Sequence, residues 1–249
     1  MKITSYNVKN GGLSLRAALV ADFHNGDPSP LLNAVRELSP DVILVAGDVV
    51  HDGERMENGL TFLREATRIA PVFCVLGNHE KRCGEQISRR IAETGAQLLD
   101  DRFVRLGGAV IGGLTSGSDG VKRSRLKKTA PPKTEWLDQF CAEEGVKILL
   151  SHHPEYYMPF LAHRPIDLIL SGHAHGGQWR FFGQGVFAPG QGFFPRFTSG
   201  VYRGKRRCRG PIELSEGAAL MLVSRGLYNH TWIPRILNSE ELIVLSFEK

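Results

Sequence analysis

The sequence predicts an α/β fold built around a parallel sheet that helices cover on both faces. Three short apolar runs, at residues 16–22, 41–46 and 72–76, alternate with segments of helical spacing. Nearly every position in these runs is apolar, which is typical of parallel strands that are buried on both faces. Because helices usually connect the strands of such a sheet, the order β-α-β-α-β indicates this class.

The helical segments of the first half carry recognisable signals. The first begins at Asp27 and Pro28, a favoured N-cap residue followed by the residue preferred at the first helical position, and it stops before Pro40. Apolar side chains recur at helical spacing along residues 54–69, and residues 83–94 are predicted to form a third helix.

The second half continues this pattern before the composition changes. A helix is expected at residues 134–144, and buried strands are expected at 146–151 and 167–171. Beyond them the chain is rich in glycine and aromatic residues and ends in strand-like runs at 218–224 and 242–247. We expect mixed or antiparallel strands and long loops there. Residues 1–249 show no linker or repeat and are expected to form a single domain.

Composition excludes several classes of protein. The chain has 249 residues, of which 42% are hydrophobic and 23% charged, so disordered and fibrous classes do not fit. No apolar run reaches the ~18 residues of a membrane-spanning helix, and the first residues are too polar for a signal peptide. We therefore expect a soluble, cytoplasmic protein with no transmembrane segment. The four cysteines lack metal-binding spacing and are expected to be free thiols.

The net charge of +5 is concentrated in two basic clusters, at residues 122–128 and 203–209. The simplest interpretation of each cluster is a solvated loop. An anionic partner is the alternative, either nucleic acid or the surface of a membrane. The excess of charge is modest, so nucleic acid is not the favoured partner, while peripheral contact with a membrane stays open.

Aspartate, asparagine and histidine residues follow five of the predicted strands. In open α/β sheets, ligands bind just beyond the carboxyl ends of the strands. Five of the nine histidines belong to this set, which structural histidines placed at random would not explain. The residues are Asp22, His24, Asp48, Asn78, His79, His152, His173 and His175.

This set of side chains favours a metal centre. Carboxylate, amide oxygen and imidazole ligands without a thiolate suit Mn, Fe, Zn or Co. The ligands are too numerous for one ion, so two divalent metal ions sharing a bridging carboxylate are expected. Residues i and i+2 of a strand point to the same side, so Asp22 should act with His24, and His173 with His175.

In these residues the sequence resembles the calcineurin-like metallophosphoesterase superfamily. The motifs of that family occur here in order as Asp22-x-His24, Gly47-Asp48, Gly77-Asn78-His79-Glu80, His152 and Gly172-His173-x-His175. The segments GHAHGGQ (172–178), APGQGFFP (188–195) and VSRGL (223–227) are similar to the narrower bacterial YkuE/YaeI-type branch. The resemblance extends from about residue 16 to residue 247.

The resemblance implies a four-layer αββα sandwich of two mixed sheets packed face to face, with a dimetal site at the strand ends. It implies that Asp22, His24, Asp48 and His175 hold one ion, and that Asp48, Asn78, His152 and His173 hold the other. Asp48 would bridge the two ions. His79 would not be a ligand, and would contact the substrate phosphate or protonate the leaving oxygen as a general acid.

The implied chemistry is hydrolysis of a phosphodiester, a phosphomonoester or a pyrophosphate. A hydroxide shared by two dications is available as a nucleophile near neutral pH, and the ions neutralise the phosphate oxygens. His79 suits protonation of the leaving group. The expected partner is a small-molecule or lipid-linked phosphate ester. Alternatives are a hydrolase of a lipid-linked nucleotide resembling UDP-diacylglucosamine, a nuclease that uses the basic clusters, and a non-catalytic metal-binding module.

Several further residues near these motifs carry weaker expectations. Asn78 and His79 are also candidates for substrate contact, as are Gly176 through a backbone N–H group and Arg225 through its guanidinium. Many relatives place an aspartate three residues after the bridging aspartate to support the catalytic histidine, but this chain has His51 there and Asp52 next. Either residue could support His79. The remaining histidines, His153, His163 and His230, are expected to be structural or surface residues, with strand alternation turning His153 away from the metals.

Overall fold

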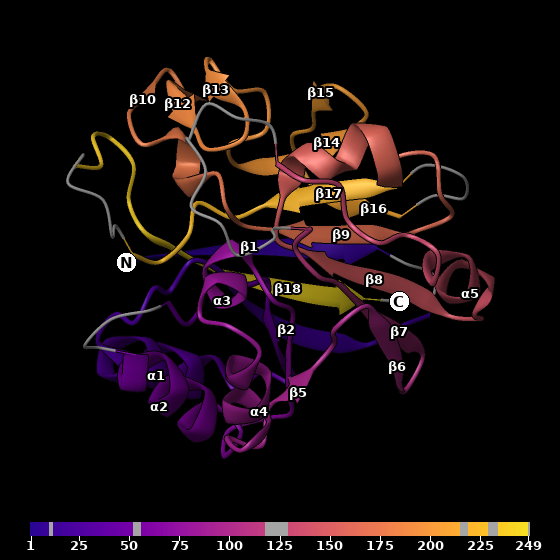
Figure 1. Cartoon of the computed structure of the whole chain (residues 1–249). Coiled ribbons are helices and arrows are strands. Elements are labelled where there is room, and N and C mark those ends of the chain that lie inside the picture. The colour runs from indigo at the N-terminus through magenta and orange to yellow at the C-terminus, as the bar shows by residue number, and fades with distance from the viewer. Residues whose placement is uncertain (10–11, 52–55, 118–128, 215–218, 229–233, 249) are drawn as a thin grey trace.

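The computed structural model describes all residues except 10–11, 52–55, 118–128, 215–218, 229–233 and 249. In this part of the chain, two seven-stranded mixed sheets lie face to face with helices outside them (Figure 1). The fold is therefore the α/β sandwich of two mixed sheets that was expected.

The first sheet has the strand order β16-β1-β18-β2-β3-β4-β5. All its neighbouring strands are parallel except β18 and β2. Its strands are β1 (Lys2–Lys9), β2 (Leu15–Val20), β3 (Val42–Val45), β4 (Val72–Cys74), β5 (Gln97–Leu98), β16 (Ile212–Glu213) and β18 (Glu241–Glu248).

The second sheet has the strand order β15-β14-β17-β9-β8-β7-β6. Its central strands are parallel and its outer pairs are antiparallel. Its strands are β6 (Arg102–Leu106), β7 (Ala109–Leu114), β8 (Val146–Ser151), β9 (Leu168–Ser171), β14 (Gly200–Arg203), β15 (Arg206–Arg207) and β17 (Leu220–Val223).

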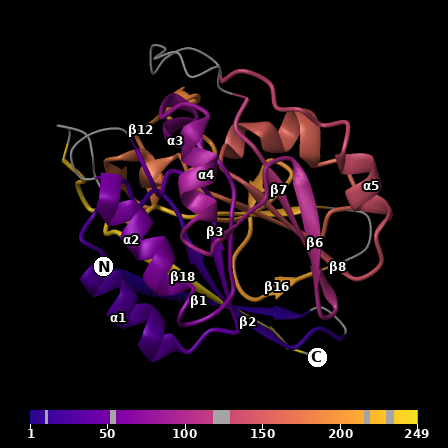
Figure 2. The same ribbon diagram turned by 60° about the horizontal axis from the view of Figure 1, so that its bottom comes forward.

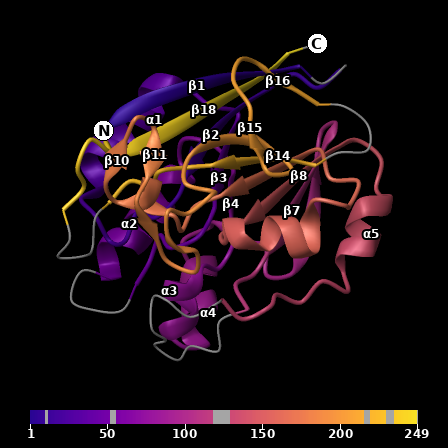
Figure 3. The ribbon, with the colours of Figure 1, turned by 90° about the horizontal axis from the view of Figure 1, so that it is seen from above.

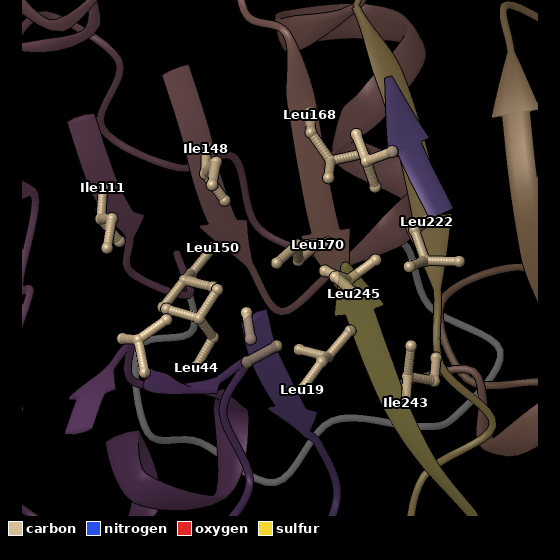
Figure 4. Packing of buried hydrophobic residues seen from close by; sticks show 14 of the residues in the cluster. Leu19, Leu44, Ile111, Ile148, Leu150, Leu168, Leu170, Leu222, Ile243 and Leu245 are labelled. Carbon is tan, nitrogen blue, oxygen red and sulfur yellow. The ribbon is translucent and has the colours of Figure 1, made fainter. Parts of the chain in front are cut away.

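The main hydrophobic core lies between the two sheets. Leu19 and Leu44 of the first sheet and Leu150 and Leu170 of the second belong to one buried cluster (Figure 4). Alternate side chains of a strand point to opposite faces of its sheet. In the central strands the side chains of the outer face are apolar as well, and they are buried beneath the helices. Burial on both faces explains why these strands appear in the sequence as continuous apolar runs.

Two outer cores attach the helices to the sheets. One cluster joins the first sheet to α1 (Pro28–Leu38), α2 (Met56–Ala66) and α4 (Gln86–Ala92). Another joins the second sheet to α5 (Leu137–Ala142), η1 (Pro154–Tyr156) and η2 (Tyr157–Leu161). Figure 2 shows α1, α2 and α4 on the side away from α5. These three cores between four layers account for the αββα architecture.

Most predicted elements are present, with differences at their ends. The helix expected at residues 83–94 is present as the shorter α4. A separate helix that was not predicted, α3 (Asn78–Arg82), precedes it, with Gly84 between the two at φ +83°. A left-handed residue of this kind ends a helix, and glycine adopts this conformation without steric cost. The helix expected at 134–144 is shorter, as α5, and the one expected at 27–39 begins as predicted, with Asp27 accepting from the Ser29 N–H group at 3.0 Å.

The structure also bears on the cysteines, on membrane-spanning helices and on the basic clusters. The four cysteines are free. Among the described residues, the structure has no helix that is long and apolar enough to cross a membrane. The basic cluster at 122–128 lies outside the described residues, whereas the cluster at 203–209 includes β15.

Candidate metal centre

The candidate centre is built by loops that leave the carboxyl ends of five strands. Strands β2, β3 and β4 contribute from the first sheet, and β8 and β9 contribute from the second. The Asp22 carboxylate accepts from the His173 N–H group at 3.0 Å through each oxygen, which ties the loops of the two sheets together. The centre therefore lies where the edges of both sheets meet.

One cluster of donor atoms consists of Asp22, His24 and His175, whose ligand atoms all lie within 4.8 Å of one another. The Nε2 atoms of His24 and His175 are 3.4 Å apart, and Nε2 of His175 is 3.8 Å from Oδ1 of Asp22. All three side chains are buried. Two imidazole nitrogens and a carboxylate that converge in this way suit a divalent cation.

A second cluster consists of Asp48, His152 and His173, again within 4.8 Å. Nε2 of His152 lies 3.0 Å from Oδ2 of Asp48, while Nδ1 of His152 lies 2.8 Å from the Ala46 carbonyl oxygen. The carbonyl holds a proton on Nδ1 and leaves Nε2 directed at the cluster. Metal-binding histidines are commonly oriented through their second nitrogen in this manner.

Asp48 lies between the two clusters. Its Oδ2 atom is 3.0 Å from Nε2 of His152 and 3.9 Å from Nε2 of His24. Its Oδ1 atom accepts from the N–H group of His79 at 2.8 Å, which fixes the plane of the carboxylate. A carboxylate held against both sets of nitrogens has the position that a bridging ligand requires.

The electrostatics of the protein groups alone fit such ions. Burial raises the pKa of Asp22 to about 7. Burial also opposes ionisation of Asp48, but His152 and His79 hold the pKa of its carboxyl well below the usual range. Burial would lower the pKa of His152, whereas the Asp48 carboxylate beside it raises that pKa to about 10. The two carboxylates are buried and the imidazole nitrogens converge on them. Divalent cations bound there would neutralise the negative charge of the carboxylates.

Strained backbone, rather than strand alternation, aims the candidate ligands. Asp22, Asp48 and His173 have φ values of 53°, 51° and 64°. His24 and His175 have φ values of 46° and 45°. Left-handed conformation is uncommon for residues other than glycine, costs on the order of 1–3 kcal/mol each and concentrates at functional sites. The prediction that residues i and i+2 continue a strand was therefore wrong. Asp22 and His24 do come together, with Nε2 of His24 3.9 Å from Oδ1 of Asp22, whereas His173 and His175 belong to different clusters.

The glycines that precede the candidate ligands leave room for them. A Cβ atom on Gly77 would lie 2.2 Å from Oδ1 of Asp48, and one on Gly172 would lie 2.9 Å from Oδ2 of Asp22. Gly47, at φ +85°, would place a Cβ atom 2.9 Å from Nδ1 of His152. Gly226 also approaches the centre, with its Cβ position 2.7 Å from Oδ2 of Asp22. Close approach of the backbone explains why glycine belongs to these motifs.

Glu80 holds two of the loops in register. Its buried carboxylate accepts from the N–H groups of Asp48 and Gly77 through Oε2 and from Val50 through Oε1, at 2.8–2.9 Å. Burial raises the pKa of Glu80 to about 8. The position of Glu80 in the motif at 77–80 did not reveal this role.

His79 and His51 lie together at one side of the centre. Nε2 of His79 is 3.9 Å from Oδ2 of Asp48, and the rings of His79 and His51 have centroids 5.4 Å apart. Asn25 binds His51, with its amide nitrogen 2.7 Å from the His51 carbonyl oxygen. Of the two candidates to support His79, the structure thus brings His51 beside it, while Asp52 lies outside the described residues.

Asn78 and Glu155 both approach His173. An atom of the Asn78 side-chain amide lies 2.9 Å from Nδ1 of His173. Nε2 of His173 is 3.8 Å from Oε1 of Glu155, a residue that the sequence did not indicate. A carboxylate on the far side of an imidazole is the usual means of orienting a metal-binding histidine.

His153 borders the centre, contrary to expectation. Its ring lies 4.3 Å from that of His173 between centroids, and its Nδ1 atom is 3.3 Å from Oε1 of Glu155. The prediction that alternation turns it away was wrong because β8 ends at Ser151, so the strand geometry does not extend to His153. His163 is exposed as expected, and His230 lies outside the described residues.

The two weaker candidates for substrate contact differ in their surroundings. The Arg225 guanidinium donates to the Glu241 carboxylate at 3.0 Å, so this arginine is engaged in an ion pair. Instead, Arg235 reaches the centre, with Nη2 3.4 Å from Nδ1 of His175. Gly176 follows His175 at φ +64°, and its carbonyl oxygen accepts from Arg180 at 2.6 Å.

Comparison with known families agrees with this site. The family model described as Calcineurin-like phosphoesterase matches residues 15–177, which include all the candidate ligands. The chain belongs to this family. The family is one of phosphoesterases, and the clusters of histidine and aspartate in this chain suggest a divalent metal centre.

Relatives share the family but have further sequence of their own. An uncharacterized metallophosphoesterase of Helicobacter pylori is 29% identical over 66% of this chain and 45% of its own length. A transmembrane protein with metallophosphoesterase domain of Bos taurus is 27% identical over 66% of this chain and 41% of its own length. The chain thus spans less than half the length of these relatives. The solved structure of TT1561 of Thermus thermophilus is 12% identical, with a TM-score of 0.47 over 83% of this chain and 99% of that one.

Proposed function

We propose that the chain hydrolyses a phosphate ester at a centre of two divalent metal ions. Asp22, His24, Asp48 and His175 would hold one ion. Asp48, Asn78, His152 and His173 would hold the other, so that Asp48 is shared. The observation that carries this proposal is the position of the buried Asp48 carboxylate, which faces the nitrogens of both clusters.

Bound divalent ions would supply a water-derived nucleophile at neutral pH and neutralise charge on the phosphate. The protein groups have their own tasks around them. Asp22 and Asp48 are the only carboxylates of the proposed ligand set, and Asn78 adds a neutral oxygen, so the centre stays attractive to an anion. The imidazole of His79 would donate a proton to the leaving oxygen.

His79 is supported in this role by its position. Its N–H group is anchored on Asp48 at 2.8 Å, and its side chain is 12% exposed, so it lies beside the centre with access to solvent. We expect His51 to contact the same phosphate or to restrain the His79 ring, because the two rings pack edge to face.

Replacing His79 by alanine tests the assignment. We expect two metal ions to remain bound while turnover of bis(p-nitrophenyl) phosphate falls by about 10²–10⁴-fold, the usual contribution of a general acid. Turnover and metal content should be measured on the same preparation. His163→Ala is the matched control, since His163 is exposed and outside the centre. Unchanged turnover in the His79 variant would remove the assignment, and loss of metal would make His79 a ligand.

We further propose that the substrate is either a small-molecule phosphate ester or a lipid-linked nucleotide. The motifs shared with the YkuE/YaeI-type branch support the second of these. We propose manganese as one suitable metal, because oxygen and imidazole ligands without thiolate accept it.

A further inference from the structure

A group of large apolar side chains is exposed beside the candidate metal centre. Phe182, Phe194 and Leu237 retain 110%, 78% and 76% of their accessible surface, the highest values among the exposed large hydrophobic residues. Scattered exposed apolar residues are ordinary, but a local group of them marks an interaction site. We call this group the aromatic surface; its members are Trp179, Phe181, Phe182, Phe193, Phe194, Ile236 and Leu237.

The members come from segments that are bonded to one another. They lie on and around the hairpins β10–β11 (Arg180–Phe181 with Gln184–Gly185) and β12–β13 (Phe187–Ala188 with Gly192–Phe193), which project together (Figure 1). The Phe194 N–H group donates to the Val186 carbonyl at 2.7 Å, and Trp179 forms a parallel bridge with Ile236. The segments that carry the aromatic surface are therefore neighbours in the fold.

The backbone provides an independent sign that these side chains serve a purpose. Phe182, Phe194 and Leu237 have φ values of 50°, 50° and 53°. Asparagine or glycine is favoured in this conformation, whereas bulky side chains are strained in it. The three most exposed large apolar residues thus occupy backbone positions that disfavour them, and folding gains no burial in return.

Positive charge adjoins the aromatic surface on the side of β15. Residues 168–212 contain no aspartate or glutamate. The turn after β10 is joined to β15 by Arg207, which donates to the Gly183 carbonyl at 3.1 Å. The strands β10, β11, β14 and β15 all lie on the face of the molecule that is turned toward the viewer in Figure 3. The exposed basic residues of this region are Arg196, Arg203, Lys205, Arg206, Arg207 and Arg209.

We propose that the aromatic surface docks on an anionic lipid bilayer. Aromatic side chains enter the interfacial region of a bilayer, and arginine and lysine around them bind anionic headgroups. A symmetric contact with a second copy fits less well, because it would bring this basic region against itself. Charge complementarity therefore favours the membrane.

Docking would also place the candidate metal centre at the bilayer. The aromatic surface continues directly into the loop of His175, since Asn238 donates to the His175 carbonyl oxygen at 2.8 Å. A lipid phosphate ester would then be the substrate class within reach. This consequence rests on the proposed function, whereas the docking itself does not.

The test is sedimentation with vesicles of phosphatidylcholine, with and without phosphatidylglycerol. The protein should bind vesicles that contain phosphatidylglycerol, and high salt should weaken this binding. The double variant Phe182→Asn and Phe194→Asn should bind about tenfold or more weakly, since each phenylalanine loses its burial in lipid. Asparagine suits the left-handed backbone, so the melting temperature should be maintained. Ile3→Asn is the matched control, because Ile3 is exposed at 44% on β1, outside the aromatic surface.

Other outcomes would overturn the proposal. It fails if the wild-type protein does not bind vesicles that contain phosphatidylglycerol, or if the double variant binds them with the same affinity as the wild type. A dimer that the double variant dissociates would assign the aromatic surface to a second copy. The wild-type protein and the double variant should turn over bis(p-nitrophenyl) phosphate in solution at equal rates. If neither protein has this activity, the result counts against the proposed function and not against docking.

Discussion

At the scale of single residues, the motifs were a better guide to the centre than to the reason it forms. Asp22, Asp48 and the histidines at the strand ends do converge. Their left-handed backbone was not readable from the sequence, because only tertiary contacts can hold non-glycine residues there. Glu155 and Arg235 were also missed, since they reach the centre through long-range contacts rather than through a local pattern.

A single methyl group tests the close approach at Gly77. Its backbone has φ −83°, which any residue adopts, so only the 2.2 Å distance from the added Cβ atom to Asp48 excludes a side chain. We expect Gly77→Ala to displace Asp48 and to reduce metal affinity by about 10–100-fold, the range typical of changes to the groups that position metal ligands. Isothermal titration calorimetry with the metal ion would measure the affinity. Gly12→Ala is the control, because a Cβ atom there meets nothing within 4 Å, and equal affinity in the two variants would refute the argument.

At the scale of elements, the strands buried on both faces were predicted well, because their apolar runs are unambiguous. β1 was missed, since most of its side chains are exposed and polar residues alternate through it. The hairpin β6–β7 was missed as well, because β6 is an exposed edge strand and Gly112 and Gly113 interrupt β7. Patterns of burial reveal central strands more readily than edges.

The loop at the start of α3 is predicted to depend on Glu80. Glu80→Gln replaces one accepting oxygen by an amide N–H group that faces backbone donors. We expect the free energy of unfolding to fall by about 1–3 kcal/mol, the cost of unsatisfied buried groups. Urea denaturation of the metal-free protein would measure it. The exposed Glu85→Gln should leave stability unchanged, and an equally stable Glu80 variant would contradict the clamp.

At the scale of the whole molecule, the residues alone predicted one covered parallel sheet, and only the family resemblance supplied the second. Residue patterns could not show this, because the assembly of the sheets depends on distant segments. β18, at the end of the chain, pairs with β1 and β2, and β17 pairs with β9. The centre lies where the two sheets meet, so it forms only when both are assembled.

If Asp48 joins two metal ions into one centre, the number of ions bound per chain must depend on this residue. After reconstitution with Mn²⁺, native mass spectrometry should find two ions in the wild-type protein and none in Asp48→Ala. Asn78→Ala should keep the ion assigned to Asp22, His24 and His175 and bind the other weakly. Two ions retained without Asp48, or a wild-type protein that binds one ion at saturation, would refute a two-ion centre that shares Asp48.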